Sequence, residues 1–255
     1  MKNAPVGFLD SGIGGITVLR KAVGVLPFES YRFFSDSLNN PYGDKEDGEI
    51  KARCDEIADI LINKEGCKAL VLACNTASAR AAEYLREKYA DTPIIAIEPA
   101  YKMVHDINPG GFTLVMATRG TLESEKFHRL YYKYNNNKTD LLACVGLADL
   151  IEQGREDELK AYLENLLGKY AGKVENVVLG CTHYPLVKDI IAGVLGDVMF
   201  FDGADGVARQ LKAVLAAKDL LNPSEEKGTI IFTDSSPDEE TRKQKEERFF
   251  RYLNG

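Results

Sequence analysis

Residues 69–89 read ALVLACNTASARAAEYLREKY, an apolar run that ends at Cys74 and continues into a segment of helical character. A short apolar run bounded by polar residues predicts a strand buried on both faces, and the residues after it predict a helix over 77–89. The pattern returns in residues 177–195, VVLGCTHYPLVKDIIAGVL, where Cys181 takes the place of Cys74. Two matching junctions of strand, cysteine and helix indicate that the chain contains two similar halves.

The remainder of the chain alternates short apolar runs with longer helical segments. Such alternation is typical of βαβ units, in which mainly parallel sheets carry helices on both faces. About nine strands in 255 residues favour two sheets over one, so we predict an α/β fold with two sheets. The expected strands are residues 5–9, 31–34, 69–73, 93–97, 112–116, 140–143, 176–179, 198–201 and 229–232.

The composition is that of a globular chain with a sizeable core, because 45% of the residues are hydrophobic and 28% are charged. Lysine and arginine number 32 and aspartate and glutamate 39, which gives a net charge of −7. This balance argues against nucleic acid or an anionic membrane as the main partner. No apolar run approaches the roughly 20 residues that span a bilayer, and residues 1–12 lack the apolar core of a secretory signal. We therefore expect a cytoplasmic protein.

The five cysteines divide into two groups by their position. No Cys-x-x-Cys pair occurs, so the sequence predicts neither a zinc ribbon nor a thioredoxin-type site, and we expect no metal. Cys74 and Cys181 each lie where a strand ends and a helix starts, a position that favours an anion and lowers a thiol pKa. We expect reactive thiols there, and buried structural thiols at Cys54, Cys67 and Cys144.

Polar segments also follow other predicted strands. Residues 10–15, DSGIGG, form either a tight turn before a helix or a cradle of backbone N–H groups for an anion. They are not a dinucleotide fingerprint, because Thr17 stands where the last glycine belongs. Residues 36–43 form an active-site loop or a solvated loop, and the hydroxyls of residues 118–124 either cap a helix or hold a carboxylate.

Two further features have more than one interpretation. His183 starts a helix two residues after Cys181, which makes a role in proton transfer plausible. Residues 238–253 are predicted to form a charged surface helix that docks through Phe249 and Phe250, or that forms a subunit contact.

Five segments of the chain together resemble the glutamate racemases of the aspartate/glutamate racemase family. The most specific are the two that contain Cys74 and Cys181, and the set spans about residues 6–202. The segments are FLDSGIGG (8–15), NPYG (40–43), ACNTAS (73–78), ATRGT (117–121) and LGCTHYPL (179–186).

The resemblance implies a cofactor-independent enzyme that interconverts L- and D-glutamate for bacterial peptidoglycan. It also implies two pseudo-symmetric α/β lobes with the active site in the cleft between them, and commonly a homodimer. The chain is expected to return to the first lobe near its C-terminus. We therefore expect residues 1–97 and 210–255 in the first lobe and 98–209 in the second.

The chemistry explains why two cysteines are needed. Racemisation removes the Cα proton from one face of the substrate and returns a proton to the other face. Two thiols from two lobes can flank one carbon and exchange the roles of base and acid. The candidate groups that clamp the carboxylates and the ammonium are Ser11, Asn75, Thr76, Thr118, Thr121 and Thr182.

The resemblance also implies individual roles. Cys74 deprotonates D-glutamate and Cys181 deprotonates L-glutamate, while Asp10 and His183 assist the thiols and contact the substrate. Asp36 and Glu152 are expected as supporting acids. The substrate loop contributes Pro41, Tyr42 and Gly43.

Three alternatives remain open on the sequence alone. An aspartate racemase or a related two-cysteine isomerase would use the same scaffold. A hydrolase with Cys181 as nucleophile and His183 as base would leave Cys74 without a role. A non-catalytic binder of amino acids would need neither cysteine.

Overall fold

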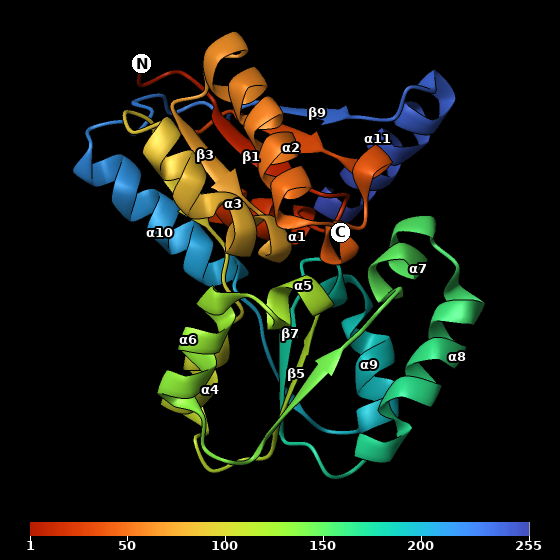
Figure 1. Cartoon of the computed structure of the whole chain (residues 1–255). Helices are drawn as coiled ribbons and strands as arrows, with labels where there is room; N and C mark the ends of the chain where they lie inside the picture. Colours follow the sequence, from red (N-terminus) through yellow and green to blue (C-terminus); the bar gives the residue numbers. More distant parts are fainter. Residues whose placement is uncertain (255) are drawn as a thin grey trace.

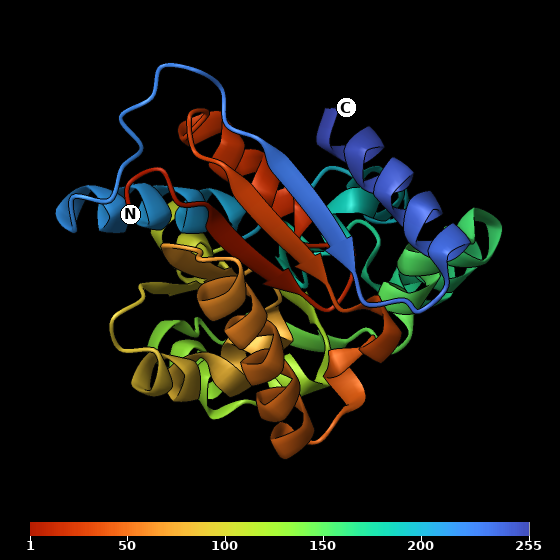
Figure 2. The same cartoon turned by 90° about the horizontal axis from the view of Figure 1, so that it is seen from above.

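The computed structural model describes residues 1–254 and shows two lobes, one above the other (Figure 1). The first lobe is built on a five-stranded parallel sheet with the order β4-β3-β1-β2-β9. Its strands are β1 (Val6–Asp10), β2 (Tyr31–Ser35), β3 (Ala69–Leu72), β4 (Ile94–Ala96) and β9 (Ile230–Asp234). Figure 2 shows β9, from the end of the chain, beside strands from its beginning.

Helices cover both faces of the first sheet because its strands are apolar on both sides. Phe8 packs on the face covered by α1, α10 and α11, whereas Leu9 packs on the face covered by α2 and α3. The bounds are α1 (Ile16–Val25), α2 (Asp47–Asp59), α3 (Asn75–Lys88), α10 (Ala204–Ala217) and α11 (Glu239–Asn254).

The second lobe repeats this arrangement on a four-stranded parallel sheet with the order β6-β5-β7-β8. Helices α7, α8 and α9 cover one face, and α4 and α6 cover the other. The strands are β5 (Thr113–Ala117), β6 (Thr139–Ala143), β7 (Asn176–Gly180) and β8 (Met199–Phe201). The helices are α4 (Tyr101–Ile107), α5 (Arg119–Leu122), α6 (Glu125–Tyr134), α7 (Leu147–Gln153), α8 (Glu156–Leu167) and α9 (Lys188–Leu195).

The two halves share one topology, which brings the cysteines to equivalent places. In the first sheet the chain leaves β1 for β2 on one side and then places β3 on the other side of β1. In the second sheet β5, β6 and β7 follow the same order. Ligands bind open α/β sheets at the carboxyl end of such a reversal. Cys74 follows β3 and Cys181 follows β7, so each cysteine lies at this point of its own lobe.

The predicted strands and the two sheets are confirmed, with shifts of one or two residues at the ends. The helix after Cys74 begins at Asn75 instead of residue 77, because the Cys74 side chain itself caps the helix. The segment after His183 opens with the 3₁₀ turn Tyr184–Val187, in which Pro185 donates no backbone hydrogen bond, and only then becomes α9.

The expected lobe boundary at 209/210 needs correction. It would cut α10, yet Ala204, Val207 and Leu211 of this helix are all buried in the core of the first lobe. The packing therefore places the boundary ahead of Ala204. Among residues 1–254, no helix is both long and apolar enough to cross a membrane.

Candidate active site

Cys74 lies at the start of α3 and is almost completely buried. Its sulfur accepts a hydrogen bond from the backbone N–H of Ala77 at 3.5 Å and lies 3.6 Å from the hydroxyl oxygen of Ser11. Burial raises the pKa of the Cys74 thiol to about 12, and the charges of Asp10 and Cys181 act in the same direction. The Cys74 side chain is therefore a thiol at neutral pH in this arrangement.

Asp10 connects the surroundings of the two cysteines. It ends β1 and is fully buried, and its two carboxylate oxygens accept from the Gly12 N–H at 2.8 Å and from the Thr182 hydroxyl at 2.9 Å. Burial raises the pKa of Asp10, although His183 and these two hydrogen bonds oppose the rise. Thr182 belongs to the second lobe and follows Cys181 in the chain. The carboxylate therefore spans the boundary between the lobes.

Cys181 is part of a chain of three side chains. Its sulfur lies 3.8 Å from Nδ1 of His183, and Nε2 of that histidine lies 2.8 Å from a carboxylate oxygen of Glu152. Burial opposes a charged imidazole, but the contacts with Cys181 and Glu152 raise the pKa of His183 well above its ordinary value. The imidazole is therefore held as a cation next to the sulfur.

Glu152 is fixed from the opposite lobe as well. The backbone N–H of Ile13 donates to its Oε2 at 3.0 Å. Although burial acts in the opposite direction, the contact with His183 and this hydrogen bond lower the pKa of Glu152. A Cβ at position 12 would lie 2.6 Å from the same oxygen, and one at position 14 would lie 2.6 Å from His183 Nδ1. Glycine at 12 and 14 is what allows this close approach.

Three threonine hydroxyls gather where the lobes meet. The hydroxyl oxygen of Thr76, on α3, lies 3.0 Å from that of Thr118 and 3.4 Å from that of Thr121. Thr118 also caps α5 by accepting from the backbone N–H of Thr121, so helix capping is confirmed for this side chain. The hydroxyls satisfy one another here, and the same donors could turn to a carboxylate.

The loop of residues 36–43 is anchored by an ion pair that the sequence did not indicate. Both carboxylate oxygens of Asp36 accept from Arg53, at 2.8 and 2.9 Å, and Tyr42 donates its hydroxyl to Asp36 at 2.6 Å. Burial acts to raise the pKa of Asp36, but Arg53 and these hydrogen bonds outweigh it and lower the pKa.

Asp36 therefore holds the loop in place, and the Tyr42 hydroxyl is occupied by it. The loop also meets the second lobe directly: Asn40 donates to Asp149 at 2.9 Å, and a Cβ at Gly43 would lie 2.8 Å from Thr118.

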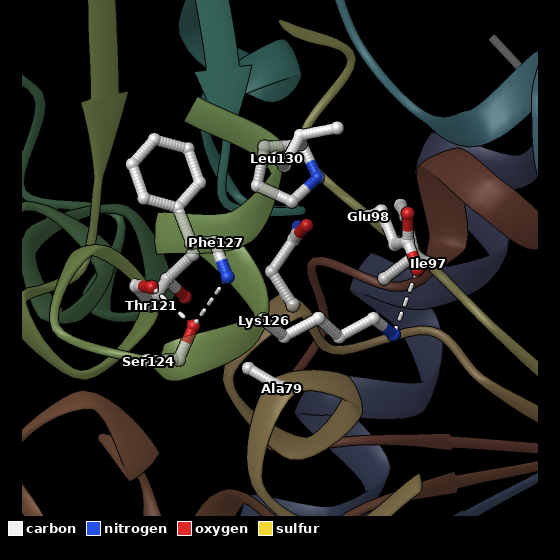
Figure 3. Close-up of a pocket in the computed structure, with 10 residues that line it drawn as sticks. Ala79, Ile97, Glu98, Thr121, Ser124, Lys126, Phe127 and Leu130 are labelled. Carbon is white, nitrogen blue, oxygen red and sulfur yellow. Dashed lines mark hydrogen bonds and ion pairs between the residues drawn. The ribbon is translucent and has the colours of Figure 1, made fainter. Parts of the chain in front are cut away.

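Asn75 follows Cys74, and its amide oxygen is buried with no hydrogen-bond partner among residues 1–254. It lines a narrow pocket between α3, the connection after β4 and α6 (Figure 3). Figure 3 shows Lys126 directed toward Glu98, and the two side chains form an ion pair at 2.9 Å. An unsatisfied amide oxygen next to Thr121 offers an acceptor for an ammonium group.

The structure thus brings most of the predicted residues together. The contacts form two groups. One contains the two cysteines with Asp10, Ser11, Thr182, His183 and Glu152. The other brings Thr76 to Thr118 and Thr121, and Asn75 lines a pocket together with Thr121. Arg53 was missed, because nothing in its spacing on α2 points to a partner in the loop. Cys54, Cys67 and Cys144 are buried, as expected, and within the described part of the chain all five cysteines are unbridged.

Comparison with known proteins places these observations in a family. A family model of the Asp/Glu/hydantoin racemases matches residues 29–211. The glutamate racemase of Clostridium perfringens (strain ATCC 13124) is 43% identical over 243 residues, which cover 93% of each chain.

Two solved structures are similar over nearly the whole length. A glutamate racemase isoform of Bacillus anthracis superposes with a TM-score of 0.86 at 28% identity, covering 100% of this chain and 96% of that one. The glutamate racemase of Francisella tularensis, in complex with D-glutamate, has a TM-score of 0.82 at 28% identity and covers 98% and 95%.

Proposed function

The chain belongs to the Asp/Glu/hydantoin racemase family and is an amino-acid racemase, and from this premise we propose that it interconverts L- and D-glutamate by proton transfer between two cysteines. The observation that carries the proposal is the pair of buried thiols at equivalent strand ends, whose surroundings are linked by the hydrogen bond from Thr182, next to Cys181, to Asp10. Relatives at 40–43% identity named glutamate racemase support glutamate as the substrate.

In the proposed L-to-D direction one cysteine starts as the thiol and the other as the thiolate. Cys74 carries its proton, because burial raises the pKa of its thiol to about 12. The L-to-D direction requires a thiolate at Cys181, which His183, held as a cation by Glu152 and lying 3.8 Å from the sulfur, can stabilise. Cys181 then takes the Cα proton of L-glutamate as Cys74 gives its proton to the opposite face, which yields D-glutamate. The reverse reaction starts from the Cys74 thiolate.

The remaining site residues hold the substrate and stabilise the negative charge that develops as the Cα proton leaves. Thr76, Thr118 and Thr121 supply hydroxyl donors for one carboxylate, and Asn75 supplies an acceptor for the ammonium. The backbone of residues 41–43 is assigned to contacts with the substrate. Donors preorganised in a dry site act without reorganising during the reaction. The mechanism uses no cofactor and no metal.

Substrate and mechanism are tested together in D₂O. With L-glutamate, deuterium is expected at Cα as optical rotation decays, whereas L-aspartate should exchange far more slowly. Exchange of aspartate alone would identify an aspartate racemase, and exchange of neither would rule out both. A Cys181 hydrolase would stay active in Cys74→Ala, whereas the two-base racemase would lose turnover.

We assign the product to bacterial peptidoglycan, and the protein to the cytoplasm as a homodimer, on the resemblance to glutamate racemases. Expression of the chain should restore growth of a bacterial strain that requires added D-glutamate, and Cys74→Ala should not. Light scattering of the purified protein tests the dimer, and a monomeric mass would contradict it.

A further inference from the structure

Helix α11 joins the end of the chain to the first lobe and reaches the second. Phe249 is fully buried, with its ring 4.9 Å from that of Phe33 and 4.5 Å from that of Phe232, measured between centroids. Phe249 thereby fixes α11 to the first sheet. Arg248, its neighbour in the chain, extends to α7 of the second lobe, which lies beside α11 in Figures 1 and 2.

The Arg248 guanidinium binds the carboxyl end of α7. It donates to the carbonyl oxygens of Ile151, at 2.5 Å, and Glu152, and it lies over the Tyr252 ring at 5.4 Å. The last carbonyls of a helix lack partners within the helix and carry partial negative charge. A guanidinium with two parallel donors satisfies two of them at once, so it fixes the orientation of this helix end as well as its position.

Glu152 thus has its backbone held by Arg248 and its side chain held in the active site. Its Oε2 meets both His183 Nε2 and the N–H of Ile13, and there is no room for a Cβ at Gly12 beside it. Helix α7 has only seven residues, so a shift of its carboxyl end moves Glu152 directly. The carboxylate would then leave His183, the residue that contacts Cys181.

We infer that Arg248 is a positioning residue for the Cys181 half of the reaction: from the C-terminal helix of one lobe it fixes Glu152 in the other and, through Glu152, the imidazole of His183. The inference rests on the proposed racemase function. The other charged or titratable groups that act on the surroundings of His183 are Asp10 on β1, Asp149 on α7, Cys181 and Lys245 on α11. None of these groups donates to the backbone carbonyls at the carboxyl end of α7, as the Arg248 guanidinium does.

The matched control lies on the same helix. Arg242 also donates to two backbone carbonyls, those of Ser236 at 2.8 Å and Pro237 at 2.9 Å, but within the first lobe. Arg248→Met should lower kcat on the order of tenfold and leave KM within about twofold, whereas Arg242→Met should change neither by more than about twofold. In Arg248→Met the kcat/KM values for the L-to-D and D-to-L directions must fall by the same factor, because the equilibrium constant fixes their ratio.

A second readout separates positioning from folding. The chain has three histidines, so the His183 imidazole can be followed by NMR. In Arg248→Met its pKa should fall toward the ordinary value, and Arg248→Lys should restore kcat and the His183 titration in part. Arg248→Gln, which keeps a neutral donor, replaces the methionine variant if that one does not fold.

Wild-type kcat with a wild-type His183 titration in Arg248→Met would overturn the inference, and so would equal losses in Arg248→Met and Arg242→Met. A wild-type protein that exchanges no glutamate proton would overturn the proposed function instead. The His183 titration would still decide whether Arg248 holds Glu152 in place.

Discussion

The two cysteines occupy the same place in two similar lobes, but different groups surround them. Cys74 meets neutral groups, the Ser11 hydroxyl and the Ala77 N–H. Cys181 meets a histidine that is held as a cation by a buried glutamate. The repeated topology therefore gives both thiols their position, and the side chains around them make them chemically unequal. In the echoed segments, His183 stands where the first lobe has Thr76.

The largest expected effect comes from removing either sulfur. Cys74→Ala and Cys181→Ala should each lower racemisation by on the order of a thousandfold or more, because one face of the substrate then lacks its acid or base. Circular dichroism checks that both variants fold. Cys67→Ala, which removes a buried thiol ahead of β3, at the end of the strand opposite Cys74, is the matched control and should retain activity. Full racemisation by either active-site variant would contradict the comparison.

The next effect separates Thr76 from His183. His183→Asn should lower kcat on the order of a hundredfold, because the cation next to Cys181 is lost. Thr76→Ala should mainly raise KM, on the order of tenfold, because a donor for the substrate carboxylate is lost. Steady-state kinetics in both directions measures the split. If kcat and KM changed in the same way in both variants, the two lobes would not be specialised as described.

A smaller effect is expected at the anchor of the substrate loop. Arg53→Met leaves the buried Asp36 carboxylate without its cation, so the loop of residues 36–43 should loosen. KM is expected to rise severalfold with little change in kcat, since the chemistry lies elsewhere. Lys51→Met, on the exposed face of the same helix, is the control and should have no effect.

The last effect is one on stability and concerns pH. The raised pKa of His183 stabilises the fold fully below its unfolded pKa of about 6.5, and this contribution is lost as pH rises through the folded pKa. The lowered pKa of Glu152 stabilises above about 4.3 and is lost as pH falls through its folded pKa.

The pair should therefore contribute most between about pH 4.3 and 6.5. Glu152→Gln should lower Tm by about 5 °C in that window, and less at higher pH. Glu164→Gln, at an exposed position, is the control. A Tm difference that does not change with pH would contradict the assignment of charge to this pair.

The sequence predicted what depends on local pattern. Apolar runs located the strands, and the cysteines at two strand ends located the centre of the site. Partners far apart in the chain were not predictable in this way: Arg53 and Asp36 are brought together by packing of α2 on the sheet, and Arg248 and Glu152 by docking of α11. The boundary at 209/210 was wrong for a related reason, since nothing in the sequence of α10 tells which lobe its apolar face covers.

The central claim is that two sulfurs serve opposite faces of one carbon. The most direct measurement follows the first turnovers of L-glutamate in D₂O by mass spectrometry, with L and D forms separated. The account predicts deuterium at Cα of nearly all early D-glutamate, delivered by Cys74, while the remaining L-glutamate is still unlabelled. Early D-glutamate that keeps the original proton would show that a single base serves both faces and would contradict the account.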